Sequence, residues 1–472
     1  MCTDFARLAG RYRFGPALVI AAMLCVVLFP ARAQAWWNDD WSGRKKITID
    51  TTATGSAIEN PIGSIPVLVR LHAGNFQFEG AKEDGTDIRF VAADDKTPLK
   101  FQIEKFDSLL GEAFVWVNVP DLKPGAKTEI WLYYGNAKST GADPKGTFDA
   151  DNILVYHFAE RGSPPADSST WANNGQAAGQ PSASSIIGPG LHLDGQTPLA
   201  LPASPSLAFA ENGALTWSAW INMEAAQPRA ALYGRREGAN VFTIGLENGV
   251  PFVEVTGAAG TARSEPGTAI VPGTWHHLAV TAENGQITIY LDGASYGTFA
   301  ASLPAFTGAA VLGGVPAEAA AAGDTSVGFV GDIDELEISK VARPAGLIKA
   351  AAIGQGSDPA KFISYGTEEA GSSSWFSGGY FGVILQSVTP DGWVVIVLLM
   401  IMAAIFWSIR RSCNSVTRPR SPSTSILRTP APTASISWPS SRRRSANRVP
   451  TPGPNSRICP TPASSCWSIR RS

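Results

Sequence analysis

The stretch GTWHHLAVTAENGQITIYLDG, residues 273–293, decides the fold class. Residues 286–291 alternate polar and apolar side chains with the two-residue period of a β-strand, and Asp292-Gly293 behind them is a typical hairpin turn. His276 and His277 are neighbours, so in a strand their side chains face opposite sides of the sheet. The two rings cannot converge on one metal ion, and we expect structural roles for both.

The same period recurs along the chain in both directions from this stretch. Trp217 and Trp220 are predicted to lie in one core strand. Residues 114–119 are apolar on nearly every position, which is typical of a strand covered on both faces. We predict an all-β protein of two tandem sandwich or jelly-roll domains, because short runs of this kind recur without a long helical period. The clearest further runs are 45–49, 65–71, 87–92, 99–106, 113–119 and 128–134.

Composition agrees with turn-rich β domains and excludes some functions. The chain has 472 residues, 44% of them hydrophobic and 17% charged, with 47 Gly and 34 Pro. Residues 36–392 carry 39 acidic against 22 basic side chains, a balance of −17. Nucleic acid is therefore excluded as a partner, because phosphate contacts need a basic surface. No disulfide framework, Cys-ligated zinc or Cys nucleophile fits the main body, because the cysteines are at positions 2, 25, 413, 459 and 466.

The first 35 residues are predicted to be a signal peptide. Arg7, Arg11 and Arg13 precede an apolar stretch at 16–29, and small-x-small cleavage sites follow at 31–33 and 33–35. The alternative is an uncleaved anchor. In either case we expect the main body to be exported.

A second apolar stretch, WVVIVLLMIMAAIFWSI at 393–409, is predicted to be a transmembrane helix. It has no charge and spans about 25 Å at ~1.5 Å per residue. Arg410 and Arg411 follow it, which places the C-terminal side in the cytoplasm. The alternative is a buried core helix. The predicted location is therefore a bacterial inner membrane, crossed once, with a large periplasmic N-terminal region.

Residues 410–472 are expected to form a basic, disordered tail rich in Ser, Pro and Arg. From position 413 on, the tail contains ten Arg and no Lys, Asp or Glu. Two origins stay open: translation in a wrong reading frame, or a genuine tail that binds anionic lipid.

Three segments resemble a bacterial exported domain of unknown function. They are WWNDDWSGRKKITID, GTDIRFVAADDKTPLKFQIEKFD and EAFVWVNVPDLKPGAKTEIWLYYGN, and the resemblance covers 36–148. The family's chemistry is unknown, so it implies no catalytic residues here.

Residues 149–368 resemble concanavalin A-like or laminin-G-like jelly rolls. The resemblance rests on LVYHFAE, ADSSTWANNG, GLHLDG, LTWSAWINM, GTWHHLAVTAENGQITIYLDG and GDIDELEISKVA. It implies a jelly roll that binds glycan or a cell-envelope component.

The acidic run 332–337 raises the alternative of a laminarinase-type hydrolase with the same fold. The run resembles the catalytic strand of such enzymes, in which two catalytic Glu flank an Asp. That strand is written ExDxE or, with a bulge, ExDxxE. Here the first position is Asp332, and only a bulge would align Glu337 as its partner. We therefore predict no enzyme and no catalytic residue. A purely structural spacer is the other alternative.

Calcium is the cofactor that the sequence suggests. Jelly rolls of this type often hold one Ca²⁺ through loop oxygens, and this hard cation needs six to eight of them. We predict Asp167, Asn173, Asp332 and Asp334 as ligands, with Asn174 nearby. The alternative is that Asp167 and the Asn residues only form Asx turns.

Residues 375–408 resemble the start of MotA/TolQ/ExbB-type proton-channel proteins, and they overlap the Gly/Ser-rich linker at 369–392. The resemblance implies a single surviving channel helix in the lipid bilayer. In intact relatives it implies homo-oligomers with an ExbD/TolR-like partner. Because no polar proton path follows, we expect this chain to bind or sense an envelope ligand.

Overall fold

The structure is a computed structural model that describes residues 36–316 and 327–371, together with Gly392, Val395, Leu398, Leu399 and Met402, which are helical. The described residues up to 371 belong to one compact unit, and a second unit begins at Pro390. The predicted signal peptide, the linker from residue 372 on and the tail lie outside the described residues. So does the predicted membrane helix, apart from four of its positions. No helix within the described residues combines the length and apolar character that a bilayer crossing requires.

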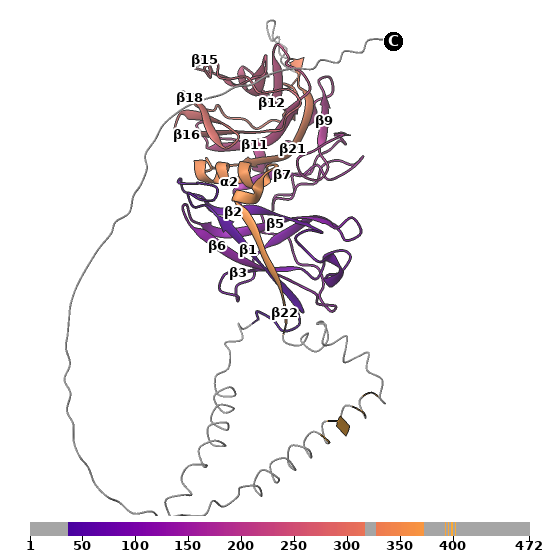
Figure 1. Cartoon of the computed structure of the whole chain (residues 1–472). Coiled ribbons are helices and arrows are strands. Elements are labelled where there is room, and N and C mark those ends of the chain that lie inside the picture. The colour runs from indigo at the N-terminus through magenta and orange to yellow at the C-terminus, as the bar shows by residue number, and fades with distance from the viewer. Residues whose placement is uncertain are drawn as a thin grey trace, which may run out of the picture. The chain divides into compact units, whose positions relative to one another are not determined.

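The first sandwich is built from two antiparallel sheets (Figure 1). Its core lies between them, where alternate residues such as Ile47, Val67, Val117 and Leu132 are buried together. All six runs listed from the sequence for this region are strands. One sheet has the order β22-β1-β6-β3, with β1 Gly43–Asp50, β3 Arg89–Ala92, β6 Lys127–Tyr134 and β22 Ile363–Ala370. The other has the order β2-β5-β4, with β2 Gly63–His72, β4 Phe101–Asp107 and β5 Glu112–Leu122.

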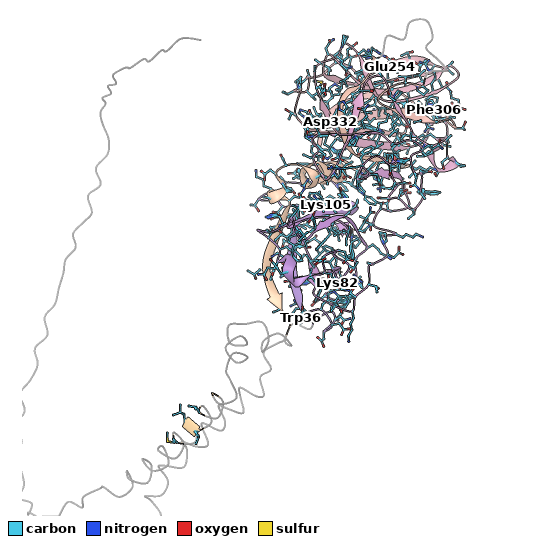
Figure 2. All side chains as sticks on the ribbon, turned by 90° about the vertical axis from the view of Figure 1, so that its right-hand side faces the viewer. Trp36, Lys82, Lys105, Glu254, Phe306 and Asp332 are labelled. Atoms are coloured by element: carbon cyan, nitrogen blue, oxygen red, sulfur yellow. The ribbon has the colours of Figure 1, made fainter. Side chains whose placement is uncertain are left out.

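Strand β5 is covered on both faces, as its sequence predicts. Val115 and Val117 point into the core of the first sandwich. Trp116 points the other way and packs with Val155 and Ile187 of the second sandwich. The outer face of the β2-β5-β4 sheet is therefore an interface between the two sandwiches. Figure 2 labels Lys105 at the end of the first sandwich that faces the second, with Trp36 at the opposite end.

The chain returns to the first sandwich at its end. Strand β22 pairs antiparallel with β1, although the sequence suggested that the second domain extends to residue 368. Arg44 of β1 holds Glu369 at 2.8 Å, and Ile363 joins the buried core. The first sheet is thus completed by a strand that lies beyond the second sandwich in sequence. The two sandwiches belong to one compact unit.

The second sandwich is a jelly roll of two larger sheets. One has the order β18-β17-β16-β11-β21-β9-β8, with β7 also paired to β21; the other has the order β10-β19-β12-β13-β14-β15, with β20 paired to β12. The strands of the first are β7 Asn152–Tyr156, β8 Gln180–Pro181, β9 Leu191–Asp194, β11 Leu215–Met223, β16 His276–Glu283, β17 Gln286–Leu291, β18 Ala294–Ala300 and β21 Val330–Ser339. Those of the second are β10 Leu199–Ala200, β12 Ala230–Glu237, β13 Asn240–Glu247, β14 Val250–Gly257, β15 Gly260–Arg263, β19 Ala310–Leu312 and β20 Val327–Gly328.

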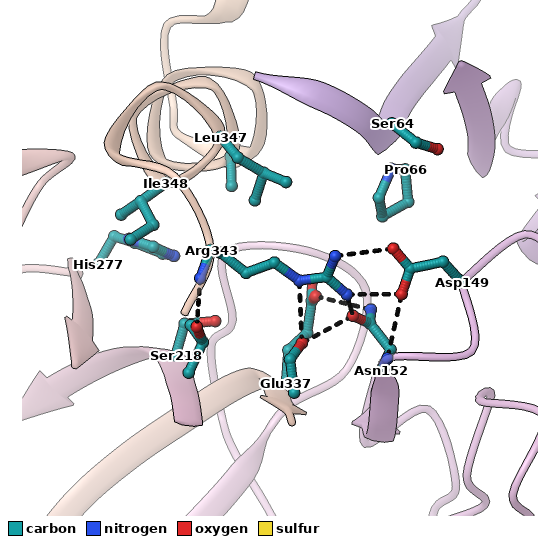
Figure 3. A pocket seen from close by; sticks show the side chains of 13 residues that line it. Ser64, Pro66, Asp149, Asn152, Ser218, His277, Glu337, Arg343, Leu347 and Ile348 are labelled. Atoms are coloured by element: carbon teal, nitrogen blue, oxygen red, sulfur yellow. Dashed lines mark hydrogen bonds and ion pairs between the residues drawn. The ribbon is translucent and has the colours of Figure 1, made fainter. Parts of the chain in front are cut away.

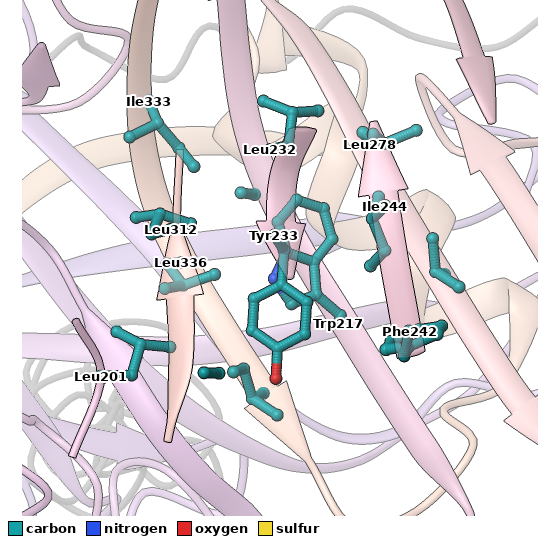
Figure 4. Packing of buried hydrophobic residues seen from close by; sticks show 14 of the residues in the cluster. Leu201, Trp217, Leu232, Tyr233, Phe242, Ile244, Leu278, Leu312, Ile333 and Leu336 are labelled. Carbon is teal, nitrogen blue, oxygen red and sulfur yellow. The ribbon is translucent and has the colours of Figure 1, made fainter. Parts of the chain in front are cut away.

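Apolar residues from both sheets fill the jelly-roll core (Figure 4). Trp217 and Trp220 share β11, as predicted, but they face opposite sides because they are three residues apart. Trp217 packs near Tyr233 in the core. Trp220 points outward, stacks edge-on against His277 and donates its indole N–H to Gln355 Oε1 at 2.8 Å. The outer face of this sheet is therefore covered as well.

Helix α2 (Ala345–Gln355) lies between the two sandwiches (Figure 1). Ala350 is buried in the core of the first sandwich, while Gln355 contacts the second through Trp220. The Arg70 guanidinium of β2 donates to the carbonyl oxygens of Gln355 at 2.6 Å and Gly356 at 2.9 Å. These carbonyls end the helix and have no partner inside it, so the cation caps the negative end of its dipole.

Candidate functional site

A bulge in β21 gathers acidic side chains at the junction of the sandwiches. The register against β11 shifts between Ser218 and Trp220, and Glu335 adopts a left-handed φ of 51°. Leu336 consequently points into the jelly-roll core. Asp334, Glu335 and Glu337 instead lie on the outer side, which the first sandwich covers. The bulge that the hydrolase alternative requires is thus present in the strand.

Three side chains from distant parts of the chain meet there. One possible ligand atom each from Glu104 of β4, His157 behind β7 and Glu335 lies within 4.8 Å of the others. His157 Nδ1 is 2.8 Å from Glu335 Oε2 and 3.8 Å from Glu104 Oε2. The Trp116 indole N–H donates to Glu104 Oε2 at 2.8 Å, and its ring stacks on His157. We call Glu104, His157 and Glu335 the junction cluster.

Burial makes the junction cluster costly for negative charge. Burial raises the pKa of Glu335 well above its usual range, and the neighbouring Glu104 carboxylate adds to this. Burial also raises the pKa of Glu104, although the charges of His157 and Arg70 oppose it. The pKa of Asp334 is raised well above its usual range, first by burial and then by Glu335. The site therefore favours any cation or proton that neutralises it.

Several polar atoms of the junction cluster have no hydrogen-bond partner within the described residues. They are Glu104 Oε1, Glu335 Oε1 and His157 Nε2, and each is buried. The Glu104 and Glu335 side chains are only 1% and 0% exposed. A buried polar atom without a partner costs about 1–3 kcal/mol. The cluster is thus the least satisfied part of an otherwise well-bonded junction.

Near the junction cluster, Arg343 organises a second, partly buried network (Figure 3). Its guanidinium donates to both carboxylate oxygens of Asp149, at 2.7 and 2.5 Å, and to Asn152. Asn152 in turn donates to Glu337 Oε2 at 3.3 Å. These groups line a cavity of about 30 Å³, which has room for about one water molecule and none for a sugar ring.

A larger cleft opens on the other side of Glu104. It measures about 470 Å³ and is lined from both sandwiches. The first sandwich contributes Glu104, Lys105, Glu112 and Phe114, and the second contributes loop residues, among them Arg161. Lys105 pairs with Glu112 at 2.5 Å and lies 5.7 Å from the centre of the Phe114 ring. This volume falls within the ~300–1,000 Å³ of typical ligand pockets.

The wall between the cleft and the junction cluster is thin at one point. Gly188 lines the cleft with a φ of +51°, and a Cβ built on it would lie 2.4 Å from Glu104 Oε1. A side chain at position 188 would therefore collide with the Glu104 carboxylate. Glycine keeps this carboxylate next to the solvent-filled cleft.

The residues predicted to bind calcium each have hydrogen-bond partners within the protein. Asp167 Oδ1 accepts the N–H groups of Val155 and Ser169, and its Oδ2 accepts Asn173 N–H and the Ser169 hydroxyl. These four bonds fill the about four lone-pair positions of a carboxylate. Asn173 is buried and bonds through its side chain to Ile153 and Ser206. A calcium ion would have to displace some of these bonds.

The two predicted ligands on β21 also have partners of their own. Asp332 lies 3.0 Å from His192 Nδ1, across the β21–β9 pairing. Asp334 accepts the N–H of Ile187 at 3.0 Å and that of Glu335 at 2.9 Å. The calcium prediction is untested by this geometry and stays a prediction. Among the described ranges 36–316 and 327–371, the junction cluster is the group of His, Cys, Asp or Glu with converging ligand atoms.

Sequence reasoning missed the junction cluster. His157 and Glu335 are 178 positions apart in sequence, and Glu104 lies in the other sandwich. Each stands in a motif that carries the family resemblances, but no spacing rule links the three. The available signal was the density of acidic residues around 335, which pointed to the right strand.

Comparisons with known families agree with two of the resemblances. Residues 193–349 match the family described as the Concanavalin A-like lectin/glucanases superfamily. Residues 84–174 match the Domain of unknown function (DUF2341), a range that includes Glu104 and His157. The first resemblance is confirmed over 84–148 and the jelly-roll resemblance over 193–349, whereas residues 149–174, which the sequence assigned to the jelly roll, match the domain of unknown function instead. Neither range extends past residue 349, and nothing supports the resemblance to a proton channel.

No curated protein matches the chain. Among solved structures, domain 4 of AbnA, a GH43 extracellular arabinanase from Geobacillus stearothermophilus, in complex with arabinotriose, is 20% identical; the match covers 43% of this chain and 98% of that one, with a TM-score of 0.34. The binding domain of Paraclostridial Mosquitocidal Protein 1 is 11% identical, covers 43% and 52%, and has a TM-score of 0.35. The Botulinum Neurotoxin serotype G binding domain is 10% identical, covers 43% and 50%, and has a TM-score of 0.34. The chain spans about half the length of these two toxin domains.

Proposed function

We propose that this chain is an envelope-facing binding protein whose cleft between the two sandwiches takes a glycan segment. The observation that carries the proposal is the 470 Å³ cleft, to which both sandwiches contribute charged side chains around one aromatic ring. The match of residues 193–349 supports the glycan, because the family name joins lectins with glucanases.

The lining suits a polyhydroxylated ligand. Lys105 and the exposed Arg161 supply donors, and Glu112 supplies acceptors. The half-buried ring of Phe114 offers an apolar face between them. Specificity in such pockets comes from a few placed polar groups on a largely preformed wall. These side chains come from a strand pair and loops packed on it, so the cleft needs little ordering when a ligand enters.

Burial of the β21 carboxylates favours binding over hydrolysis. Glu337 lines a cavity of about 30 Å³, and Asp334 is fully buried. A retaining glycosidase must place a sugar between two carboxyl groups about 5–5.5 Å apart, for which this space has no room. We therefore propose that the chain is not a hydrolase. Membrane anchoring by residues 393–409 stays part of the proposal.

Binding tests the proposal directly. The full chain, purified in mild detergent, is titrated with solubilised peptidoglycan fragments and with β-glucan oligosaccharides, and heat is measured by calorimetry. We expect saturable binding of one class and no release of reducing sugar. Lys105→Ala should weaken binding about tenfold, because a charge-assisted hydrogen bond contributes about 1.5–3 kcal/mol.

Lys123→Ala is the matched control. Lys123 is also a lysine paired with a neighbouring carboxylate, that of Asp121, but it does not line the cleft. It should leave affinity unchanged. Failure to bind any envelope fraction would favour a structural spacer, and glucan cleavage would favour the hydrolase. Equal losses of affinity in both variants would show that the cleft is not the binding site.

A further inference from the structure

The junction cluster has the composition and the spacing of a metal site. In a tetrahedral centre with bonds of about 2.0–2.1 Å, neighbouring ligand atoms are about 3.3 Å apart. His157 Nδ1 lies 2.8 and 3.8 Å from the two carboxylate oxygens, which brackets this value. Small side-chain rotations would equalise the distances. An ion pair between His157 and Glu335 alone would not explain why Glu104 also approaches His157.

The unpartnered atoms are the independent observation. Glu104 Oε1 and Glu335 Oε1, the second oxygens of the two carboxylates, are buried without a hydrogen-bond partner in the described residues. Their neighbours in the same groups are well held, because Trp116 fixes Glu104 Oε2 and His157 contacts Glu335 Oε2. Around a metal ion, supporting residues hold the ligand side chains in a fixed orientation. Here the carboxylates are held in this way and still have oxygen lone pairs without a partner.

The surrounding charge also favours a cation. Asp334 adds a further buried carboxyl group on the same strand. Of the nearby cations, Arg70 is committed to the carbonyl groups at the end of α2 and Arg343 to Asp149. A divalent ion would neutralise the carboxylates without moving either arginine.

We propose that Glu104, His157 and Glu335 bind one zinc ion, which ties the first sandwich to the second. Imidazole with two carboxylates suits Zn²⁺, which is four-coordinate with nitrogen and oxygen ligands. Ca²⁺ is a poorer match, because it takes six to eight oxygen ligands. Glu104 comes from the first sandwich and the other two ligands from the jelly roll. The ion reaches the site through the cleft beside Gly188.

Metal content and melting temperature test the proposal. The full chain in mild detergent is stripped with EDTA, dialysed, and offered Zn²⁺, Mn²⁺ or Ca²⁺ in separate samples. After removal of free ion, we expect about one Zn²⁺ per chain by mass spectrometry, and a rise of several degrees in Tm. Less than a tenth of an equivalent, or a larger Tm rise with Ca²⁺ than with Zn²⁺, would overturn the proposal.

Glu335→Gln separates a metal site from a merely structural cluster. The variant keeps the shape of the side chain and removes a buried charge, so the metal-free chain should melt at or above the wild-type temperature. It should nevertheless lose the bound zinc and the zinc-dependent rise in Tm. Glu337→Gln, which changes a half-buried carboxyl group on the same strand outside the cluster, should keep both. Zinc retained in Glu335→Gln, or lost equally in both variants, would contradict the assignment.

The zinc proposal does not rest on the proposed glycan function. Metal stoichiometry is measured without glycan, and the glycan titration can be run on stripped protein. Failure of one therefore leaves the other standing.

Discussion

The Asp167 loop and the junction cluster both contain buried or half-buried carboxylates, and they differ in how the carboxylate oxygens are bonded. Asp167 accepts four hydrogen bonds, three of them from backbone N–H groups. Glu104 and Glu335 each keep a buried oxygen without a partner in the described residues. The capacity to bind a metal ion therefore depends on unused lone pairs, which acidic composition alone does not reveal.

Replacing Asp167 should produce the largest loss of stability. Asp167→Ala leaves three backbone N–H groups without their acceptor, and we expect the free energy of unfolding to fall by about 2–4 kcal/mol. Asp167→Asn keeps one carbonyl acceptor and should cost less. Denaturant unfolding in EDTA and in Ca²⁺ measures both variants. Equal losses in the two solutions fit the hydrogen-bond role, whereas a loss confined to the Ca²⁺ solution would support calcium at Asp167.

His277 is a second buried histidine, and the pH dependence of stability tests how it differs from His157. Burial lowers the pKa of His277 to about 4, against the opposing charge of Asp292. A lowered histidine pKa means that the unfolded chain binds the extra proton first. Stability from this group is therefore complete above about pH 6.5 and falls as pH drops toward 4.

The expected size of this effect is about 1.4 kcal/mol per pH unit within that window. Between pH 6.5 and 5, wild type should lose about 1.5 kcal/mol more stability than His277→Gln. Denaturant unfolding of the two chains at both pH values gives the difference, in which contributions of the other titrating groups cancel. Parallel losses would show that His277 is not held neutral by burial.

The smallest expected effect concerns the support of the junction cluster. Trp116→Phe keeps most of the buried ring but removes the N–H that fixes Glu104 Oε2. Loss of such a supporting bond typically costs about tenfold or more in metal affinity, so zinc affinity should drop about tenfold. Competition with a chelator of known affinity measures it. Tighter or unchanged zinc binding would show that the indole does not orient Glu104.

Sequence patterns predicted the strands well and the junction poorly. Alternation of polar and apolar residues identified the strands of the first sandwich. Residues 114–119 are apolar at nearly every position, which correctly predicted that both faces of this strand are buried. What covers the second face could not be read, because the partner residues Val155 and Ile187 belong to the other sandwich. The periodicity of a single strand carries no information about packing against residues that are distant in sequence.

Two further features escaped prediction for related reasons. Strand β22 pairs with β1, more than 300 residues earlier, so its sheet is set by tertiary contacts such as Arg44–Glu369. The bulge at Glu335 decides which acidic side chains of β21 face the junction. A one-residue bulge changes side-chain direction without any composition signal. The resemblance to the jelly roll found the strand but could not find the bulge.

Anomalous X-ray scattering tests the zinc assignment most directly. Crystals of the zinc-loaded chain are measured on both sides of the zinc absorption edge, and a difference map locates the ion without reference to any expected site. We expect one strong peak in contact with Glu104, His157 and Glu335. A peak at Asp167 or Asp332, or no peak in crystals whose solution contains one zinc per chain, would contradict it.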